Sequence, residues 1–70
     1  MSRLRVWQGD EDVSDEVELG PGRSNPWGWS EYPLVHKRWV GGAIVFIQIG
    51  FLYCGEPKLN EPGYRAQVDP

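Results

Sequence analysis

The chain has 70 residues and a mass of 8.0 kDa, with seven basic and ten acidic side chains, a formal net charge of -3 and one cysteine. A soluble domain of this size is usually of marginal stability unless a disulfide, a metal or a partner supports it. The single cysteine excludes an internal disulfide, and one cysteine with one histidine cannot supply the ligands of a structural zinc site. The negative balance also disfavours nucleic acid as a partner, because phosphate contacts need a basic surface.

The N-terminal part of the chain, residues 1–32, has the composition of a polar, acidic arm. Residues 3–6 alternate basic and apolar side chains, a pattern compatible with a short strand or a docked extended arm. Residues 10–18 hold six acidic side chains in nine positions. The Gly-Pro-Gly sequence at 20–22 then ends any regular element that precedes it.

Three aromatic side chains follow in a loop-like section: Trp27, Trp29 and Tyr32. Such side chains combine an apolar ring with a polar tip and are typical of a membrane–water interface. Tyr53, at the far end of the next segment, has the same character. We therefore predict these four residues to be interface anchors.

The most apolar part of the chain runs from Trp39 to Cys54. Twelve of its 16 residues are hydrophobic and none is charged. Ser30 suits a helix N-cap, Pro33 the first helical turn, and Gly55 the position just after a helix end. A helix over about residues 33–54 would be roughly 30 Å long, close to the hydrocarbon thickness of a bilayer. The sequence therefore predicts a mainly α fold with one transmembrane helix.

This prediction divides the chain into three parts: the N-terminal arm with its aromatic interfacial loop (residues 1–32), the transmembrane helix (33–54) and a Pro-rich C-terminal arm (55–70). Both arms are expected to be extended and largely irregular, since their scattered apolar side chains do not form an opposing core of comparable size. A small excess of basic residues before the apolar run places the N-terminus on the cytoplasmic, stromal or matrix side.

A strand interpretation of the apolar segment stays open as the alternative. In it, residues 40–53 form strands that a partner chain completes. A hairpin needs a turn near its middle, whereas Gly41 and Gly42 stand at the start of the run, which allows only short, uneven arms. The odd and even positions of the run are about equally apolar, so no half-buried alternation is visible.

A short polar cluster, His36, Lys37 and Arg38, precedes Trp39 at the start of the apolar run. These four side chains are expected to anchor the helix at the interface and to contact anionic lipid headgroups or a pigment. A further possibility is that His36 is an axial ligand of a haem or chlorophyll at the helix edge. The chain has no other predicted cofactor and no predicted metal site.

Small and amide side chains within the apolar run suggest a packed helix face. Gln48 is unfavourable in hydrocarbon and is expected to hydrogen-bond to a neighbouring helix. Gly41, Gly42 and Gly50 would allow that helix to approach closely.

Two short stretches resemble known families of membrane subunits. Trp39-Val40-Gly41-Gly42, followed by Ile49-Gly50-Phe51, resembles the single helix of PufX-type polypeptides of purple-bacterial reaction-centre complexes. Asn25-Pro26-Trp27-Gly28, with Glu31 and Tyr32, is similar to the Asp-Pro-Trp motif of a small accessory subunit of respiratory complex I. Each resemblance covers less than a quarter of the chain. Both imply a small single-pass subunit of an energy-converting membrane complex.

The predicted function is therefore that of a non-catalytic, integral, single-pass accessory subunit that stabilises or assembles a photosynthetic or respiratory complex. Its expected partners are larger membrane subunits and anionic lipids. The residue inventory offers no catalytic set, because it has one histidine, no phosphate-binding loop and a bunched group of carboxylates. The alternative function is that of a small soluble interaction module, with residues 40–53 in strands completed by a partner chain.

Overall fold

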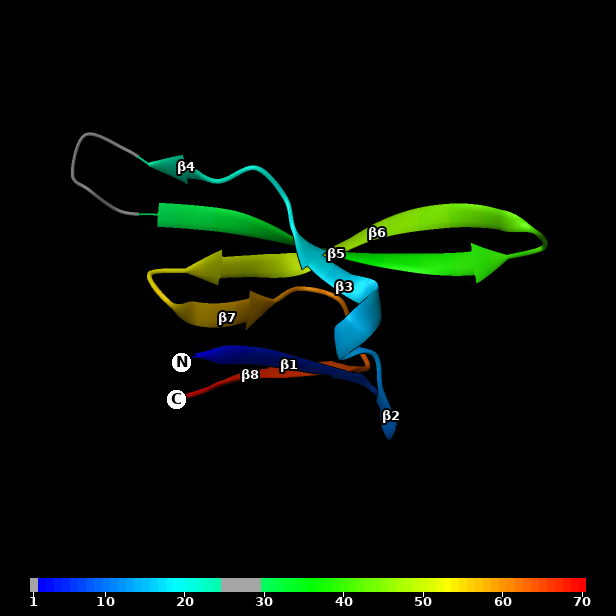
Figure 1. Cartoon of the computed structure of the whole chain (residues 1–70), viewed down its shortest axis with the longest axis horizontal. Coiled ribbons are helices and arrows are strands. Elements are labelled where there is room, and N and C mark those ends of the chain that lie inside the picture. The colour runs from blue at the N-terminus through cyan, green and yellow to red at the C-terminus, as the bar shows by residue number, and fades with distance from the viewer. Residues whose placement is uncertain (1, 25–29) are drawn as a thin grey trace.

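Strands dominate the fold in the computed structural model, which describes residues 2–24 and 30–70 (Figure 1). Within these residues the strands are β1 (Arg3–Gln8), β2 (Glu11–Asp12), β3 (Val17–Leu19), β4 (Arg23–Ser24), β5 (Ser30–Val40), β6 (Ala43–Tyr53), β7 (Glu56–Leu59) and β8 (Tyr64–Asp69). A single turn of 3-10 helix, η1 (Ser14–Glu16), lies between β2 and β3.

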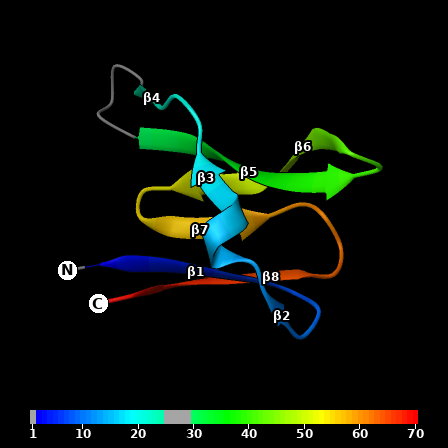
Figure 2. The same cartoon turned by 45° about the vertical axis from the view of Figure 1, so that its right-hand side comes forward.

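The strands form two antiparallel sheets. The smaller sheet has the order β2-β1-β8, so the two ends of the chain pair with each other along six residue pairs from Arg3↔Asp69 to Gln8↔Tyr64. The larger sheet has the order β3-β5-β6-β7, with β4 also paired to β5. Figures 1 and 2 show the β1–β8 pair lying beneath the larger sheet, next to β7.

The core lies between the two sheets, where alternate side chains of each strand point inward. Val6 of β1, Val13, Leu34 of β5 and Ile49 of β6 are each at most 1% exposed. Partly buried side chains from both sheets pack around these four: Leu4, Val17, Ile47, Leu59, Tyr64 and Ala66. The core therefore contains side chains from the beginning, the middle and the end of the sequence.

A long hairpin, β5–β6, is the largest element of the fold. Its turn is the pair Gly41-Gly42, with φ angles of 59° and 85°. A two-residue turn in which both residues have positive φ matches the right-handed twist of the flanking strands, and glycine adopts it without a Cβ penalty. The paired positions run from Val40↔Ala43 next to the turn to Glu31↔Tyr53 at the open end.

The predictions of a mainly α fold, of a transmembrane helix over residues 33–54 and of an integral, single-pass membrane protein are wrong. Residues 33–54 fold as most of β5, the Gly-Gly turn and β6. In the part of the chain that the structure describes, no helix is both long enough and apolar enough to cross a membrane. The apolar run is not one element, because it contains the end of β5, the Gly-Gly turn and all of β6. The first arm of the hairpin extends backwards from the turn through the polar residues 30–38, which the apolar window left out.

The expectation of irregular arms is also wrong. Residues 3–8 and 64–69, assigned to different arms, are adjacent strands of one sheet. They supply the opposing core that was not expected from the scattered apolar side chains, because alternation places Leu4 and Val6 on the same inward face. The strand alternative is confirmed in its coarser part: the apolar segment forms strands within a small β domain.

Candidate interaction surface

The outer part of the β5–β6 hairpin projects beyond the rest of the molecule (Figures 1 and 2). On β5, pairing with β3 ends at Val17↔His36, and on β6, pairing with β7 ends at Gly50↔Leu59. The backbone of Asn60 bonds to Ile49, which closes that edge as far as residue 49. Residues 37–48, here called the distal hairpin, therefore form a two-stranded ribbon.

Large apolar side chains of the distal hairpin are exposed. Trp39 is 75% exposed, Phe46 62%, Val40 52%, Ile44 48% and Val45 39%. Scattered single apolar residues are ordinary on a protein surface, but a contiguous group is typical of an interaction site. The strand pairing makes three of these residues contiguous, since Trp39 lies opposite Ile44 and Phe46 follows Ile44 on the same face of β6.

The two faces of the distal hairpin differ in composition. Directly paired residues of antiparallel strands share a face. The outer face, turned away from the core, therefore carries the pairs Val35↔Gln48, Lys37↔Phe46 and Trp39↔Ile44. The inner face carries His36↔Ile47, which joins the core, then Arg38↔Val45 and Val40↔Ala43 nearer the turn. The two most exposed aromatic side chains thus lie on the outer face.

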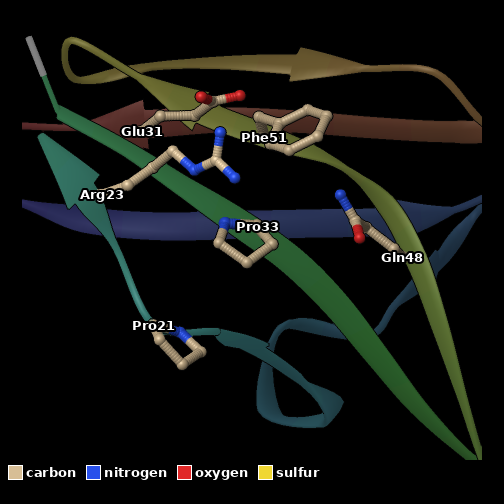
Figure 3. Close-up of a pocket in the computed structure, with 6 residues that line it drawn as sticks. All are labelled: Pro21, Arg23, Glu31, Pro33, Gln48 and Phe51. Carbon is tan, nitrogen blue, oxygen red and sulfur yellow. The ribbon is translucent and has the colours of Figure 1, made fainter. Parts of the chain in front are cut away.

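Two shallow clefts adjoin this outer face. The larger, of about 390 Å³, is lined by Pro21, Arg23, Glu31, Pro33, Gln48 and Phe51 (Figure 3). The figure shows these side chains coming from β5, β6, β4 and the segment that leads into β4. The smaller cleft, of about 240 Å³, is lined by Asp15, Glu16, Lys37, Trp39 and Ile44. Both clefts are open depressions, so they extend the outer face without forming an enclosed pocket.

Charge is distributed unequally between the hairpin and the remainder of the chain. Residues 32–55 contain no acidic side chain and two basic ones, Lys37 and Arg38. The Lys37 ammonium lies 3.2 Å from a carboxylate oxygen of Glu18 on the neighbouring strand β3. This exposed ion pair contributes little to stability. It does hold Lys37 towards the molecule and away from the hairpin tip.

His36 lies at the base of the distal hairpin and is 1% exposed. Its Nδ1 is 2.8 Å from the Tyr64 hydroxyl and its Nε2 is 3.0 Å from Oε1 of Glu16. All three groups are satisfied when the Tyr64 hydroxyl donates to Nδ1 and Nε2–H donates to the carboxylate. Burial raises the pKa of Tyr64, which keeps its phenol protonated and able to donate. The cluster joins β5, η1 and β8, so it fixes the base of the hairpin to both sheets.

Haem or chlorophyll ligation by His36 would require displacement of one of these two hydrogen bonds. Among residues 2–24 and 30–70, no group of three or more His, Cys, Asp or Glu side chains is placed to hold a metal ion. The other members of the predicted anchor cluster lie apart from His36: Lys37 and Trp39 point to the outer face, and Arg38 lies on the inner face nearer the turn.

The predicted packing residues have different positions in the hairpin. Gly41 and Gly42 form its turn, Gln48 is exposed beside the larger cleft, and Gly50 is buried. Because these residues belong to strands and a turn, the proposed helix face does not exist. The strand pairing brings together Trp39 and two residues that the sequence reasoning did not select, Ile44 and Phe46. Counting alternate residues outward from the Gly-Gly turn would have placed all three on one face.

Among the predicted interface anchors, Tyr32 is 37% exposed on β5 and Tyr53 is partly buried at the end of β6. Tyr32 pairs with Leu52 and Tyr53 with Glu31, so the two tyrosines lie on opposite faces of the sheet. Trp27 and Trp29 lie outside the described residues.

The outer face of the smaller sheet provides a contrast, because its tryptophan is covered. The guanidinium carbons of Arg5 and Arg65 lie 4.8 and 4.6 Å from the ring centre of Trp7. Arg5 is also 3.6 Å from Asp12 and 3.8 Å from Asp69. Cation–π contacts and ion pairs within the chain thus occupy this face. Trp39 has no comparable cover among the described residues, as its exposure shows.

No family model matches the chain, and no match was found among curated proteins or solved structures. The functional argument therefore depends on the geometry of the described residues.

Proposed function

We propose that the chain is a protein-interaction module that binds a partner chain through its distal hairpin. The observation that carries this proposal is the combination of an open strand edge on β6 with exposed apolar side chains on the same hairpin. Trp39 and Phe46 are the most exposed large apolar residues of the described chain, and both lie on the outer face.

The open edge supports strand addition as the mode of binding. Residues 43–48 of β6 pair with β5 on one side only. Exposed strand edges are normally protected by lysine, by proline or by an inward-pointing charge. The sequence Ala-Ile-Val-Phe-Ile-Gln at these positions has none of these protections. A partner strand would satisfy the free backbone groups of this edge, and neighbouring side chains would supply specificity.

The exposed side chains support an apolar anchor for the partner. Since an aromatic side chain buries about 150–250 Å² in a contact, the exposed parts of Trp39 and Phe46 together offer roughly 250 Å². Apolar area removed from water contributes about 25 cal/mol per Å², so these two side chains could add roughly 6 kcal/mol before the entropy loss of association. Aromatic residues are also the most frequent energetic hot spots of interfaces.

Site-specific photo-crosslinking tests the proposal. A benzophenone-bearing phenylalanine analogue replaces Phe46 in one variant and Gln67, an exposed residue of β8, in the control variant. In the cells that produce the chain, we expect irradiation to give protein adducts from position 46 and few from position 67. Equal adduct yields at the two positions, or none at position 46, would contradict the proposal.

A shortened hairpin gives a second control that preserves the fold. Deleting Trp39, Val40, Ala43 and Ile44 joins Arg38 to Val45, already a directly opposed pair, through the same Gly-Gly turn. The core side chains and their register are unchanged, so we expect a folded chain by circular dichroism. Adducts from position 46 should be lost or strongly reduced in this variant.

A further inference from the structure

We propose that the partner chain is a second copy of this protein, bound by antiparallel pairing of the two β6 strands across a twofold axis. This inference rests on the proposed function, since it names the partner of the same edge. The product would be a four-stranded sheet in the order β5-β6-β6-β5. Twofold dimers are the commonest assemblies of identical chains, and their interfaces must be self-complementary.

Backbone geometry determines which residues of β6 can take part. In a two-residue hairpin the pair that flanks the turn, Val40↔Ala43, exchanges both backbone hydrogen bonds, and the bonding pattern then alternates along the strands. The backbone groups of Ile44, Phe46 and Gln48 consequently point to the open edge. A twofold axis at Val45 places Ile44 opposite Phe46 of the second copy, with hydrogen bonds in both directions.

This register is self-complementary in side chains. It places Ile44 and Phe46 of both copies in one continuous row on the outer face, flanked on each side by Trp39 and Lys37 of β5. The row contains no charged residue, and aromatic–aliphatic cross-strand pairs are favourable. The open edge ends at residue 49, because Asn60 bonds there, so the pairing covers residues 42–48 of each copy.

Charge does not oppose the pairing. The only charged residues of the distal hairpin, Lys37 and Arg38, lie on β5. In the four-stranded sheet the two β5 strands are three strand spacings apart, about 14 Å. This separation exceeds the Debye length of about 8 Å at physiological ionic strength. A partner with many acidic groups would instead be expected if the basic pair lay on the open edge itself.

The small size of the contact predicts a weak, reversible dimer. Edge pairing covers the flanks of the apolar side chains and leaves one surface of the new sheet open, so the total buried area stays below about 1,200 Å². Interfaces of that size are typical of transient association. We therefore expect a dissociation constant in the micromolar range or weaker.

Sedimentation velocity of the purified full chain tests the inference, over roughly three decades of concentration starting near 1 µM. We expect the apparent mass to rise with concentration from 8.0 kDa towards twice that value. Ile44→Lys should raise the dissociation constant of the dimer at least tenfold. Leu19→Lys is the matched control, because Leu19 is 43% and Ile44 48% exposed. Circular dichroism checks that both variants are folded.

A disulfide test examines the register. At a non-hydrogen-bonded pair the Cα atoms lie about 4.5 Å apart, within the range that a disulfide spans. In a Cys54→Ser background, Val45→Cys should therefore form a disulfide-linked dimer on mild oxidation, and Gln67→Cys should form much less.

A wild-type chain that stays monomeric at every concentration overturns the inference, and so does a dimer that Ile44→Lys leaves intact. If the chain is monomeric while position 46 still crosslinks to another protein in cells, the second-copy inference fails and the proposed function stands. If position 46 gives no adduct either, both fail.

Discussion

Gly50→Ala distinguishes the strand architecture from a helical one, because the change in the free energy of unfolding has opposite signs in the two. Gly50 is buried on β6, beside β7. A Cβ at this position would lie 2.2 Å from the carbonyl oxygen of Lys58 and 2.8 Å from Cα of Leu59. Both atoms belong to the β7 backbone, which cannot rotate away as a side chain would. The substitution must therefore move the two strands apart.

The geometry gives the magnitude of the loss. Restoring ordinary van der Waals contact requires β6 and β7 to separate by about 1 Å, and overpacking of this kind typically costs about 1–3 kcal/mol. A chain of this length has a free energy of unfolding of only about 4–10 kcal/mol. In an exposed helix the same change would instead stabilise the protein by about 1 kcal/mol, because alanine is the better helix former.

Urea unfolding followed by tryptophan fluorescence measures this difference. With a slope of about 1 kcal/mol per molar urea, the midpoint of Gly50→Ala should fall by about 1–3 M. Gln48→Ala is the control two residues away: Gln48 is exposed, so its free energy of unfolding should change by no more than about 0.5 kcal/mol. An unchanged or increased midpoint for Gly50→Ala would refute the close approach of β7.

Three further predictions concern the core and the polar contacts around it. Tyr64→Phe should lower the free energy of unfolding at neutral pH by about 1–3 kcal/mol, because Nδ1 of buried His36 loses its donor. Burial raises the pKa of Tyr64, so the free energy of unfolding of the wild type should also fall as the pH rises above about 10. Urea unfolding measured against pH should show a smaller fall in Tyr64→Phe. Hydrogen bonds from Ser14 hold the pKa of Asp12 below its ordinary value, so the stability they give is present above pH 4 and is lost as the pH falls through the lowered pKa. The difference in urea unfolding midpoint between the wild type and Asp12→Asn should therefore become smaller as the pH falls through that pKa. Leu34→Ala removes a side chain that is 0% exposed, and calorimetry should show a loss of about 2–5 kcal/mol.

Some elements of this fold can be predicted from the sequence. The alternation of residues 3–6 indicated a possible strand, and β1 confirms it. The Gly41-Gly42 pair signals a hairpin turn, and the structure has its turn there. The apolar run alone predicts arms that are too short, because most of the first arm lies outside that run. In a two-stranded ribbon both arms have equal length by construction, so the second arm lies among residues 30–38 whatever their polarity.

Long-range contacts explain what the sequence could not show. His36 is an isolated polar residue in the sequence, and its partners Glu16 and Tyr64 are 20 and 28 positions away. Nothing local predicts that these three side chains meet. The same holds for the pairing of β1 with β8, which joins the two ends of the chain. Such contacts depend on how the whole chain closes, and periodicity within one segment carries no information about that.

The apolar run also explains why hydropathy alone misled. The two parts of this run have different environments. Ile47 and Ile49 belong to the core, whereas Trp39, Ile44 and Phe46 are exposed beyond the core. Folding alone does not require the hairpin to extend beyond about residues 38 and 45, because the pairing of both strands with the rest of the molecule has already stopped there. Extending it further adds exposed apolar surface and an unprotected edge, both of which favour aggregation unless something covers them. The length of the hairpin beyond the core is therefore consistent with the proposed binding, and the uncharged run that resembled a membrane span contains the proposed binding edge.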